Sequence, residues 1–186
     1  AISRLPQSLE SLAVWPVLLS VSFLGRSIAM SYQEVGIALL QDRRDLEMLQ
    51  RFSRMLGAVM LLVFTVFAFS PLAEIWFRDV VGLAAGLTGM TRIPMVFIAV
   101  LPAVTSLISW KRAILVTAKR TPAITRSVIV NLLVLGLILL VLGYTLPANG
   151  ALIAAIAYAG SVTAEWLYLH FAASRAGNRL FPDRER

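Results

Sequence analysis

Charged and amide side chains interrupt the first long apolar stretch of the chain. Arg26, Gln33 and Glu34 lie within residues 11–40, which are apolar at both ends. At about 1.5 Å of rise per residue, a helix over this stretch can cross a hydrocarbon core of about 30 Å, and Arg26 then lies near the middle of the bilayer. Charge at that depth usually faces a protein interior or an aqueous cavity. A guanidinium there is suited to a phosphate or carboxylate group, because its planar donors match two oxygens at once.

The neighbours of Arg26 on the same helix predict a substrate-binding wall. Ser22, Met30, Gln33 and Glu34 share one broad face with Arg26. We assign Arg26 as the principal substrate-side cation, Gln33 as a hydrogen-bonding wall, and Glu34 as a candidate for ion coupling or for holding the surroundings of Arg26. Arg26 and Glu34 are roughly 12 Å apart along a helix, so they cannot neutralise each other on one span. The alternative is structural, an ion pair between Arg26 and another helix.

The remaining polar residues of the apolar segments predict structural contacts. Asn131 stands alone in an aliphatic stretch and should bond a neighbouring helix. Glu74 and Glu165 are expected near span ends, beside tryptophans of an interfacial belt, and His170 at the membrane exit. The chain has no cysteine and one histidine, too few ligands for a thiolate or histidine metal site. We therefore predict no metal, no cofactor and no catalytic residue.

Composition indicates an integral membrane protein. Of 186 residues, 59% are hydrophobic and 15% charged, and the mean hydropathy is +0.81. The net charge of +7 lies in short runs between apolar segments, where topology places basic residues, so we expect no nucleic-acid partner. A membrane enzyme acting on lipid phosphates would need clustered acids, or histidine with arginine and serine, and the chain offers neither.

The expected architecture is an all-α polytopic bundle of about five transmembrane helices. Asp42 should cap a surface helix over residues 41–54. We expect a break at Pro71 and a Gly-rich connection over residues 78–92. The third span should be bent. Ala151, Ala155 and Ala159 form a small-residue face for close helix packing. We place the spans at about 11–40, 55–77, 93–110, 122–146 and 151–173, between a polar lead at 1–10 and a polar tail at 174–186.

Basic residues gather on one side of these spans. Residues 41–54 hold four arginines, residues 111–126 five basic residues and the tail four, against three on the opposite side. The positive-inside rule then predicts a cytoplasmic C-terminus and an outward N-terminus in the cytoplasmic (inner) membrane. Such an N-terminus without a signal peptide is consistent with spans missing upstream, so we expect a fragment. Five basic residues of the connection at 111–126 either contact anionic lipid head groups at the cytoplasmic surface or only fix the orientation of the chain: Lys111, Arg112, Lys119, Arg120 and Arg126.

The order of these features resembles the C-terminal lobe of the multidrug/oligosaccharidyl-lipid/polysaccharide flippase superfamily, which includes MATE-type exporters and lipid-linked precursor flippases. The segments that carry the resemblance are RSIAMSYQEVGIALL running into DRRDLEMLQRFSR, then PLAEIWF, RAILVTAKRTPAIT and GALIAAIAYAGSVTAEWLYL. It implies that the five spans match helices eight to twelve of a two-lobe transporter, without the first lobe and the first helix of the second.

The resemblance also implies a function and partners. The expected activity is alternating-access transport of an amphipathic or lipid-linked substrate, with membrane lipid around the protein and protons or sodium as candidate coupling ions. A missing N-terminal lobe or a second copy would complete the cavity. The alternative is a helical membrane scaffold or accessory subunit that transports nothing.

Overall fold

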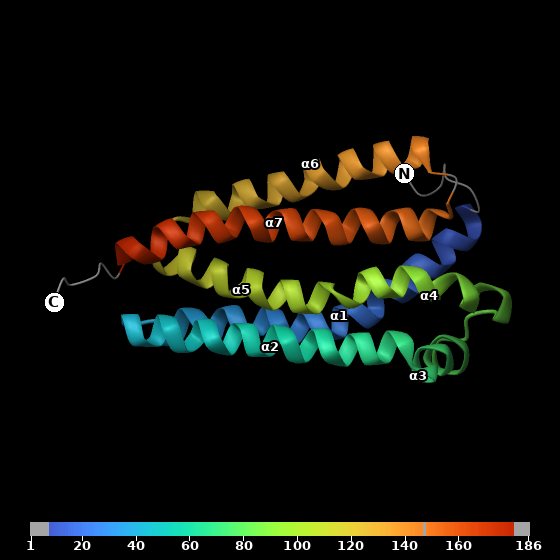
Figure 1. The fold of residues 1–186 in the computed structure, drawn as a ribbon, viewed down its shortest axis with the longest axis horizontal. Helices are drawn as coiled ribbons and strands as arrows, with labels where there is room; N and C mark the ends of the chain where they lie inside the picture. Colours follow the sequence, from blue (N-terminus) through green and yellow to red (C-terminus); the bar gives the residue numbers. More distant parts are fainter. Residues whose placement is uncertain (1–7, 147, 181–186) are drawn as a thin grey trace.

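The computed structural model describes residues 8–146 and 148–180, and all regular structure within them is helical (Figure 1). This confirms the all-α prediction. The elements in chain order are α1 (Ser8–Leu39), α2 (Arg43–Phe69), α3 (Pro71–Ile75), the π-helix η2 (Trp76–Val80), α4 (Ala85–Ala99), α5 (Leu101–Thr117), α6 (Thr121–Thr145) and α7 (Gly150–Leu180).

Five segments of the described chain are long and apolar enough to cross a membrane, as predicted. They lie side by side along the long axis of the molecule, which is therefore a multi-pass membrane protein (Figure 1). A helix bonds its own backbone groups, which is what a hydrocarbon environment requires. The segments are Leu9–Leu39, Arg43–Phe69, Gly86–Thr117, Thr121–Thr145 and Gly150–Gly177.

The second span begins earlier than predicted, because the expected surface helix is not a separate element. Asp42 caps α2 as predicted, accepting from the Asp45 amide at 2.8 Å. From there α2 continues without a break to Phe69. The buried residues of α2 recur every three or four positions and are Leu49, Ser53, Gly57 and Met60. One buried face therefore runs along α2 from its charged first turns into its apolar part.

Two expected connections are shorter in the structure. Only residues 81–84 separate η2 from α4, where the sequence predicts a connection over residues 78–92. At the other end of the bundle, α5 continues to Thr117, so Lys111 and Arg112 lie inside a helix and not in the basic connection. The turn into α6 consists of residues 118–120, with Lys119 in the left-handed conformation (φ 54°) that often ends helices.

The predicted breaks at proline are present. Ser70 ends α2 and caps α3, where Pro71 occupies the first turn. The third span is interrupted at Val100 between α4 and α5, with Pro102 in the first turn of α5. At the C-terminal end, α7 extends to Leu180 through the first half of the expected tail, while the expected lead and tail residues 1–7 and 181–186 lie outside the described chain.

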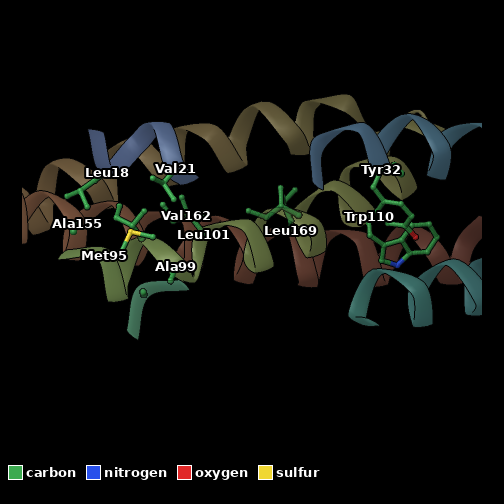
Figure 2. Packing of buried hydrophobic residues seen from close by; sticks show 14 of the residues in the cluster. Leu18, Val21, Tyr32, Met95, Ala99, Leu101, Trp110, Ala155, Val162 and Leu169 are labelled. Atoms are coloured by element: carbon green, nitrogen blue, oxygen red, sulfur yellow. The ribbon is translucent and has the colours of Figure 1, made fainter. Parts of the chain in front are cut away.

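The core centres on the third span, which packs against α1, α2 and α7. Figure 2 shows Leu18 of α1 with Met95 of α4 and Ala155 of α7 near one end of this core, and Tyr32 beside Trp110 near the other. Helix α6 packs mainly on α7 and buries none of its leucine, isoleucine and valine side chains, half of which are exposed, as expected for a face turned to lipid.

Two glycines bring α1 close to its neighbours. A Cβ atom on Gly25 would lie 2.4 Å from the Phe64 ring and 2.9 Å from Pro102, and one on Gly36 would lie 2.9 Å from the Ala113 Cβ. Only a residue without a side chain allows this approach. Because Gly25 precedes Arg26, the contact holds the Arg26 backbone against the start of α5.

Candidate functional site

A cavity of about 200 Å³, here called the polar groove, lies between α1, α5, α6 and α7. Two arginines, a glutamate, two amides and three hydroxyl groups line it together with four apolar side chains. Its lining residues are Arg26, Met30, Gln33, Thr105, Ile108, Ser109, Arg112, Val128, Asn131, Tyr158, Val162 and Glu165.

Arg26 is held by two hydroxyl groups on other helices. Its Nε donates to Thr105 Oγ1 on α5 at 3.2 Å, and its Nη1 donates to the hydroxyl of Tyr158 on α7. The guanidinium carbon lies 5.5 Å from the centroid of the Tyr158 ring, within range of a cation–π contact. Thr105 in turn donates to the Leu101 carbonyl at 2.7 Å, which leaves its oxygen as an acceptor for Arg26.

No acidic side chain of the described residues pairs with Arg26. The structure therefore does not contain the alternative arrangement, an ion pair from Arg26 to another helix. We call Arg26, Thr105 and Tyr158 the Arg26 cluster. It orients the guanidinium and leaves its charge uncompensated by any described carboxylate.

Arg112, by contrast, pairs with Glu165. Its Nη2 lies 2.5 Å from Glu165 Oε1. Ser127 Oγ on α6 lies 3.3 Å from the same oxygen and shares its one hydrogen between that oxygen and the Ile124 carbonyl, which is nearer at 2.8 Å. Asn131 Nδ2 donates to Glu165 Oε2 at 3.0 Å, which confirms that Asn131 bonds a neighbouring helix. We call Arg112, Ser127, Asn131 and Glu165 the Glu165 cluster. It joins α5, α6 and α7 and satisfies both carboxylate oxygens.

The position of Glu165 corrects a prediction. The sequence places it near a span end beside Trp166, but it lies halfway along α7 and is only 6% exposed. The third span and α7 both extend further than expected, so residues assigned to the membrane surface lie inside the bundle. Glu74, predicted in the same way, is exposed on α3.

The two clusters are stacked along the bundle axis. Thr105 and Arg112 are seven residues apart on α5, and Tyr158 and Glu165 are seven residues apart on α7. Seven residues are about two helical turns, or about 10.5 Å. Because α1, α5 and α7 run in the same direction, the polar positions of α5 and α7 recur in step (Figure 1). This spacing, repeated on α1 by Arg26 and Gln33, is the sequence signal that identifies Arg112 and Glu165 as groove residues.

A second cavity, here called the apolar hollow, adjoins the Arg26 cluster. It has a volume of about 720 Å³, and Arg26 and Tyr158 line both cavities. Its other lining residues are Leu19, Ser20, Phe23, Leu24 and Trp76. A charged site and an apolar surface therefore meet at Arg26.

The structure brings three of the five predicted wall residues together. Arg26, Met30 and Gln33 line the polar groove. Glu34 is exposed on α1 outside both cavities. Ser22 is buried, 1% exposed, and its hydroxyl has no hydrogen-bond partner in the described chain. The predicted face is thus divided among a cavity, the helix-packing interior and the surface.

The basic residues assigned to the connection are also divided. Lys119, Arg120 and Arg126 are exposed at the turn into α6 and along its first turns. Arg112 belongs to the Glu165 cluster, and Lys111 is 9% exposed on another side of α5. Consecutive residues of a helix point about 100° apart, which accounts for the separation of Lys111 from Arg112.

Within residues 8–146 and 148–180, no three metal-binding side chains of histidine, cysteine, aspartate or glutamate come together. The chain was also compared with protein-family models, curated proteins and solved structures, and none of them matches it.

Proposed function

We propose that this chain forms one wall of a membrane transporter that moves an amphipathic anion, such as a lipid-linked phosphate, by alternating access. The observation that carries the proposal is Arg26, a mid-helix guanidinium held by hydroxyl groups at the meeting point of the polar groove and the apolar hollow. The resemblance to the flippase superfamily supports the same conclusion.

The charge of the polar groove supports an anionic substrate. Arg26 and Arg112 contribute two positive charges and Glu165 one negative charge, so one cation remains uncompensated. A cation in low-dielectric surroundings is stabilised by an anion that supplies hydrogen-bond acceptors. Thr105 and Tyr158 hold the guanidinium in place, which reduces the entropy lost when a ligand binds.

The two cavities support a substrate with both a polar and an apolar part. The polar groove, about 200 Å³, is smaller than a typical small-molecule pocket and suits a head group alone. The larger apolar hollow offers Leu19, Phe23 and Trp76 for a hydrocarbon chain. We propose that a further lobe or a second copy of the chain supplies the opposite wall, and that the substrate crosses as the two walls rock against each other.

A helical scaffold that transports nothing is the second candidate. The Glu165 cluster favours it, because this cluster cross-links α5, α6 and α7 with every carboxylate oxygen satisfied. The two functions differ in what they require of Arg26. A scaffold needs only a folded bundle, whereas a transporter needs the Arg26 charge when substrate binds.

Binding of a polyprenyl phosphate to the purified chain in detergent micelles tests the proposal, with the uncharged polyprenol as the matched ligand. Tryptophan fluorescence is the readout, because Trp15 packs edge-on against Tyr158 with ring centroids 6.2 Å apart. Arg26→Ala should weaken binding of the phosphate about tenfold, the effect of losing one charged hydrogen bond. Arg26→Lys should lose less affinity for the phosphate than Arg26→Ala if a point charge is enough. It should lose as much affinity as Arg26→Ala if the planar guanidinium is required.

Arg126→Ala is the control variant, because this arginine is exposed on α6 away from both cavities. It should bind the phosphate as the unaltered chain does. If Arg26→Ala melts at the same temperature as the unaltered chain and binds the phosphate equally well, the transport site is not at Arg26. The scaffold function is then preferred.

Orientation in the membrane is part of the proposal. We propose that the chain lies in the cytoplasmic membrane with the turn between α5 and α6 on the cytoplasmic side, because Lys119, Arg120 and the arginines at the start of α2 gather at that end. A cysteine at Lys119 should react with an impermeant reagent only after the cells are opened. A cysteine at Tyr144, which is 88% exposed at the opposite end of α6, should react in intact cells. The reverse pattern would invert the topology.

A further inference from the structure

A third cavity lies at the end of the bundle where α2 begins and α5 and α7 end. This end pocket has a volume of about 290 Å³ and shares no lining residue with the polar groove or the apolar hollow. Its polar lining consists of Arg43, Glu47, Gln50, Lys111, His170 and Ser174. The proposed transport function assigns it no role.

Lys111 is the unusual member of the end pocket. The residue is 9% exposed, yet its ammonium group has no hydrogen bond or ion pair within the described chain. Most of the side chain is withdrawn from water, and its ammonium group lines the pocket without an acceptor from the protein, so a cation there is stabilised by an anion. Buried lysines are accordingly rare unless they are paired. An anion in the end pocket would supply the missing acceptors.

The other charges around the pocket add to this preference. Glu47 is the one acidic residue in the described lining, and it pairs with Arg43 one helical turn away on α2, at 3.9 Å. Arg54, also on α2, acts on Lys111 as a like charge. The net charge facing the pocket is positive, so the missing partner of Lys111 is an anion.

The neutral groups narrow the chemistry of that anion. Ser174 already donates its hydroxyl hydrogen to the His170 carbonyl at 2.7 Å, so it offers only an acceptor. The side-chain donors that line the pocket are Lys111, the Gln50 amide, Arg43 and the ring N–H of His170. These are the donors that phosphate oxygens accept. The pocket is also wide enough to admit more than the phosphate group itself.

We propose that the end pocket binds the phosphate group of an anionic ligand, with Lys111 as the charged contact and Gln50 as a hydrogen-bond donor. The phosphate is carried by a lipid head group or by a small soluble ester. Both have the same chemistry at Lys111 and differ in whether acyl chains extend from the pocket into the bilayer. The site is independent of the transport proposal, since it uses other residues and another end of the bundle.

The test uses the purified full chain and Lys111→Met, which keeps an unbranched side chain of similar length without the charge. Phosphatidylglycerol retained by the chain is measured by native mass spectrometry, with zwitterionic phosphatidylcholine as the comparison lipid. Lys111→Met should retain about tenfold less phosphatidylglycerol, the loss expected for a charged hydrogen bond. Retention of phosphatidylcholine should not change. Lys119→Met removes an exposed lysine eight residues away and should reduce phosphatidylglycerol retention clearly less than Lys111→Met does, because an exposed cation remains hydrated.

A melting experiment distinguishes the two sources of phosphate. Glycerol 3-phosphate added to detergent-solubilised protein should raise the melting temperature of the unaltered chain, and not that of Lys111→Met, if the natural ligand is a soluble ester. If only phosphatidylglycerol raises it, the ligand is a lipid. Either result supports the site.

A second variant keeps the test decisive if Lys111→Met does not fold. Gln50→Ala removes the neutral donor from a half-buried position of the same pocket and should reduce phosphatidylglycerol retention about threefold, as one neutral hydrogen bond would. Retention equal to the unaltered chain in the variants that fold, together with no melting response to either phosphate compound, would overturn the proposal.

Discussion

Arg26 on α1 and Arg112 on α5 line the same groove and are held in different ways. The clusters that hold them are about two helical turns apart along α5 and α7. Hydroxyl groups of Thr105 and Tyr158 orient Arg26, whereas Arg112 pairs with the buried carboxylate of Glu165. A hydroxyl acceptor fixes the direction of a guanidinium without cancelling its charge. A carboxylate does both. The comparison indicates that Arg112 is a structural residue of the bundle and that Arg26 is the arginine whose charge is available to a ligand.

Removing the carboxylate should give the largest effect on stability. Glu165→Leu leaves Arg112 enclosed without an anion, which should cost about 3 kcal/mol. The double variant Arg112→Leu, Glu165→Leu removes both charges and should recover most of this loss. Thermal melting in detergent measures both. If the single variant melts like the unaltered chain, Arg112 does not depend on Glu165 and the contrast between the two arginines is lost.

The packing that positions Arg26 should be the next most sensitive. Gly25→Ala forces a methyl group against the Phe64 ring and Pro102 and should cost about 2 kcal/mol. Gly160→Ala is the matched control, because its methyl group would meet only the terminal carbon of Ile138, which can move aside. The free energy of unfolding of this control should lie within about 0.5 kcal/mol of that of the unaltered chain, or exceed it, because alanine favours the helix. Equal losses would show that the approach of α1 to its neighbours is not tight at Gly25.

Asn131 tests the Glu165 cluster from its α6 side. Asn131→Ala removes one hydrogen bond to a buried carboxylate and should cost about 1.5 kcal/mol. Gln33→Ala is the comparison, because this groove amide has no hydrogen-bond partner within the described chain and its loss should leave the melting temperature nearly unchanged. A larger loss for Gln33→Ala than for Asn131→Ala would contradict the assignment of Asn131 as the structural amide.

The smallest stability change is expected at Tyr158. Tyr158→Phe keeps the ring beside the Arg26 guanidinium and removes only a hydroxyl acceptor at a half-buried site, so it should cost about 0.5 kcal/mol. Affinity for the polyprenyl phosphate should change more clearly, because the guanidinium becomes less well oriented. An unchanged affinity would mean that Thr105 alone is enough to place Arg26.

The sequence predicts the Arg26 site better than the Glu165 cluster. A lone cation in a long apolar stretch can be recognised without knowing its neighbours, and the same holds for Asn131. The partnership of Arg112 with Glu165 depends on how α5, α6 and α7 lie against one another. Lys111 and Arg112 begin a basic run in the sequence, so residue type alone placed them at the membrane surface. The seven-residue spacing of Thr105 and Arg112 on α5, and of Tyr158 and Glu165 on α7, is the sequence signal that favours a position inside the bundle for Arg112.

Helix boundaries were the least predictable part of the fold. The number of spans follows from hydropathy, and the breaks at Pro71 and before Pro102 follow from proline chemistry. The continuity of α2 does not follow from the sequence, because the first turns of this helix are charged. Burial along one face of α2 shows that these turns belong to the span. Charged residues can extend a membrane helix when one face of that helix is covered by protein.

The enclosure of the third span has a consequence for synthesis in the cell. In its most apolar stretch 67% of the residues are buried, against none in the corresponding stretch of α6. The fourth span can therefore remain in lipid as soon as it leaves the insertion machinery, whereas the third reaches its final surroundings only when α7 has been made. Until then Arg112 has no carboxylate beside it and Arg26 has no tyrosine. A nascent chain stalled before α7 would leave Arg112 without its carboxylate and Arg26 with Thr105 as its one remaining partner of the Arg26 cluster.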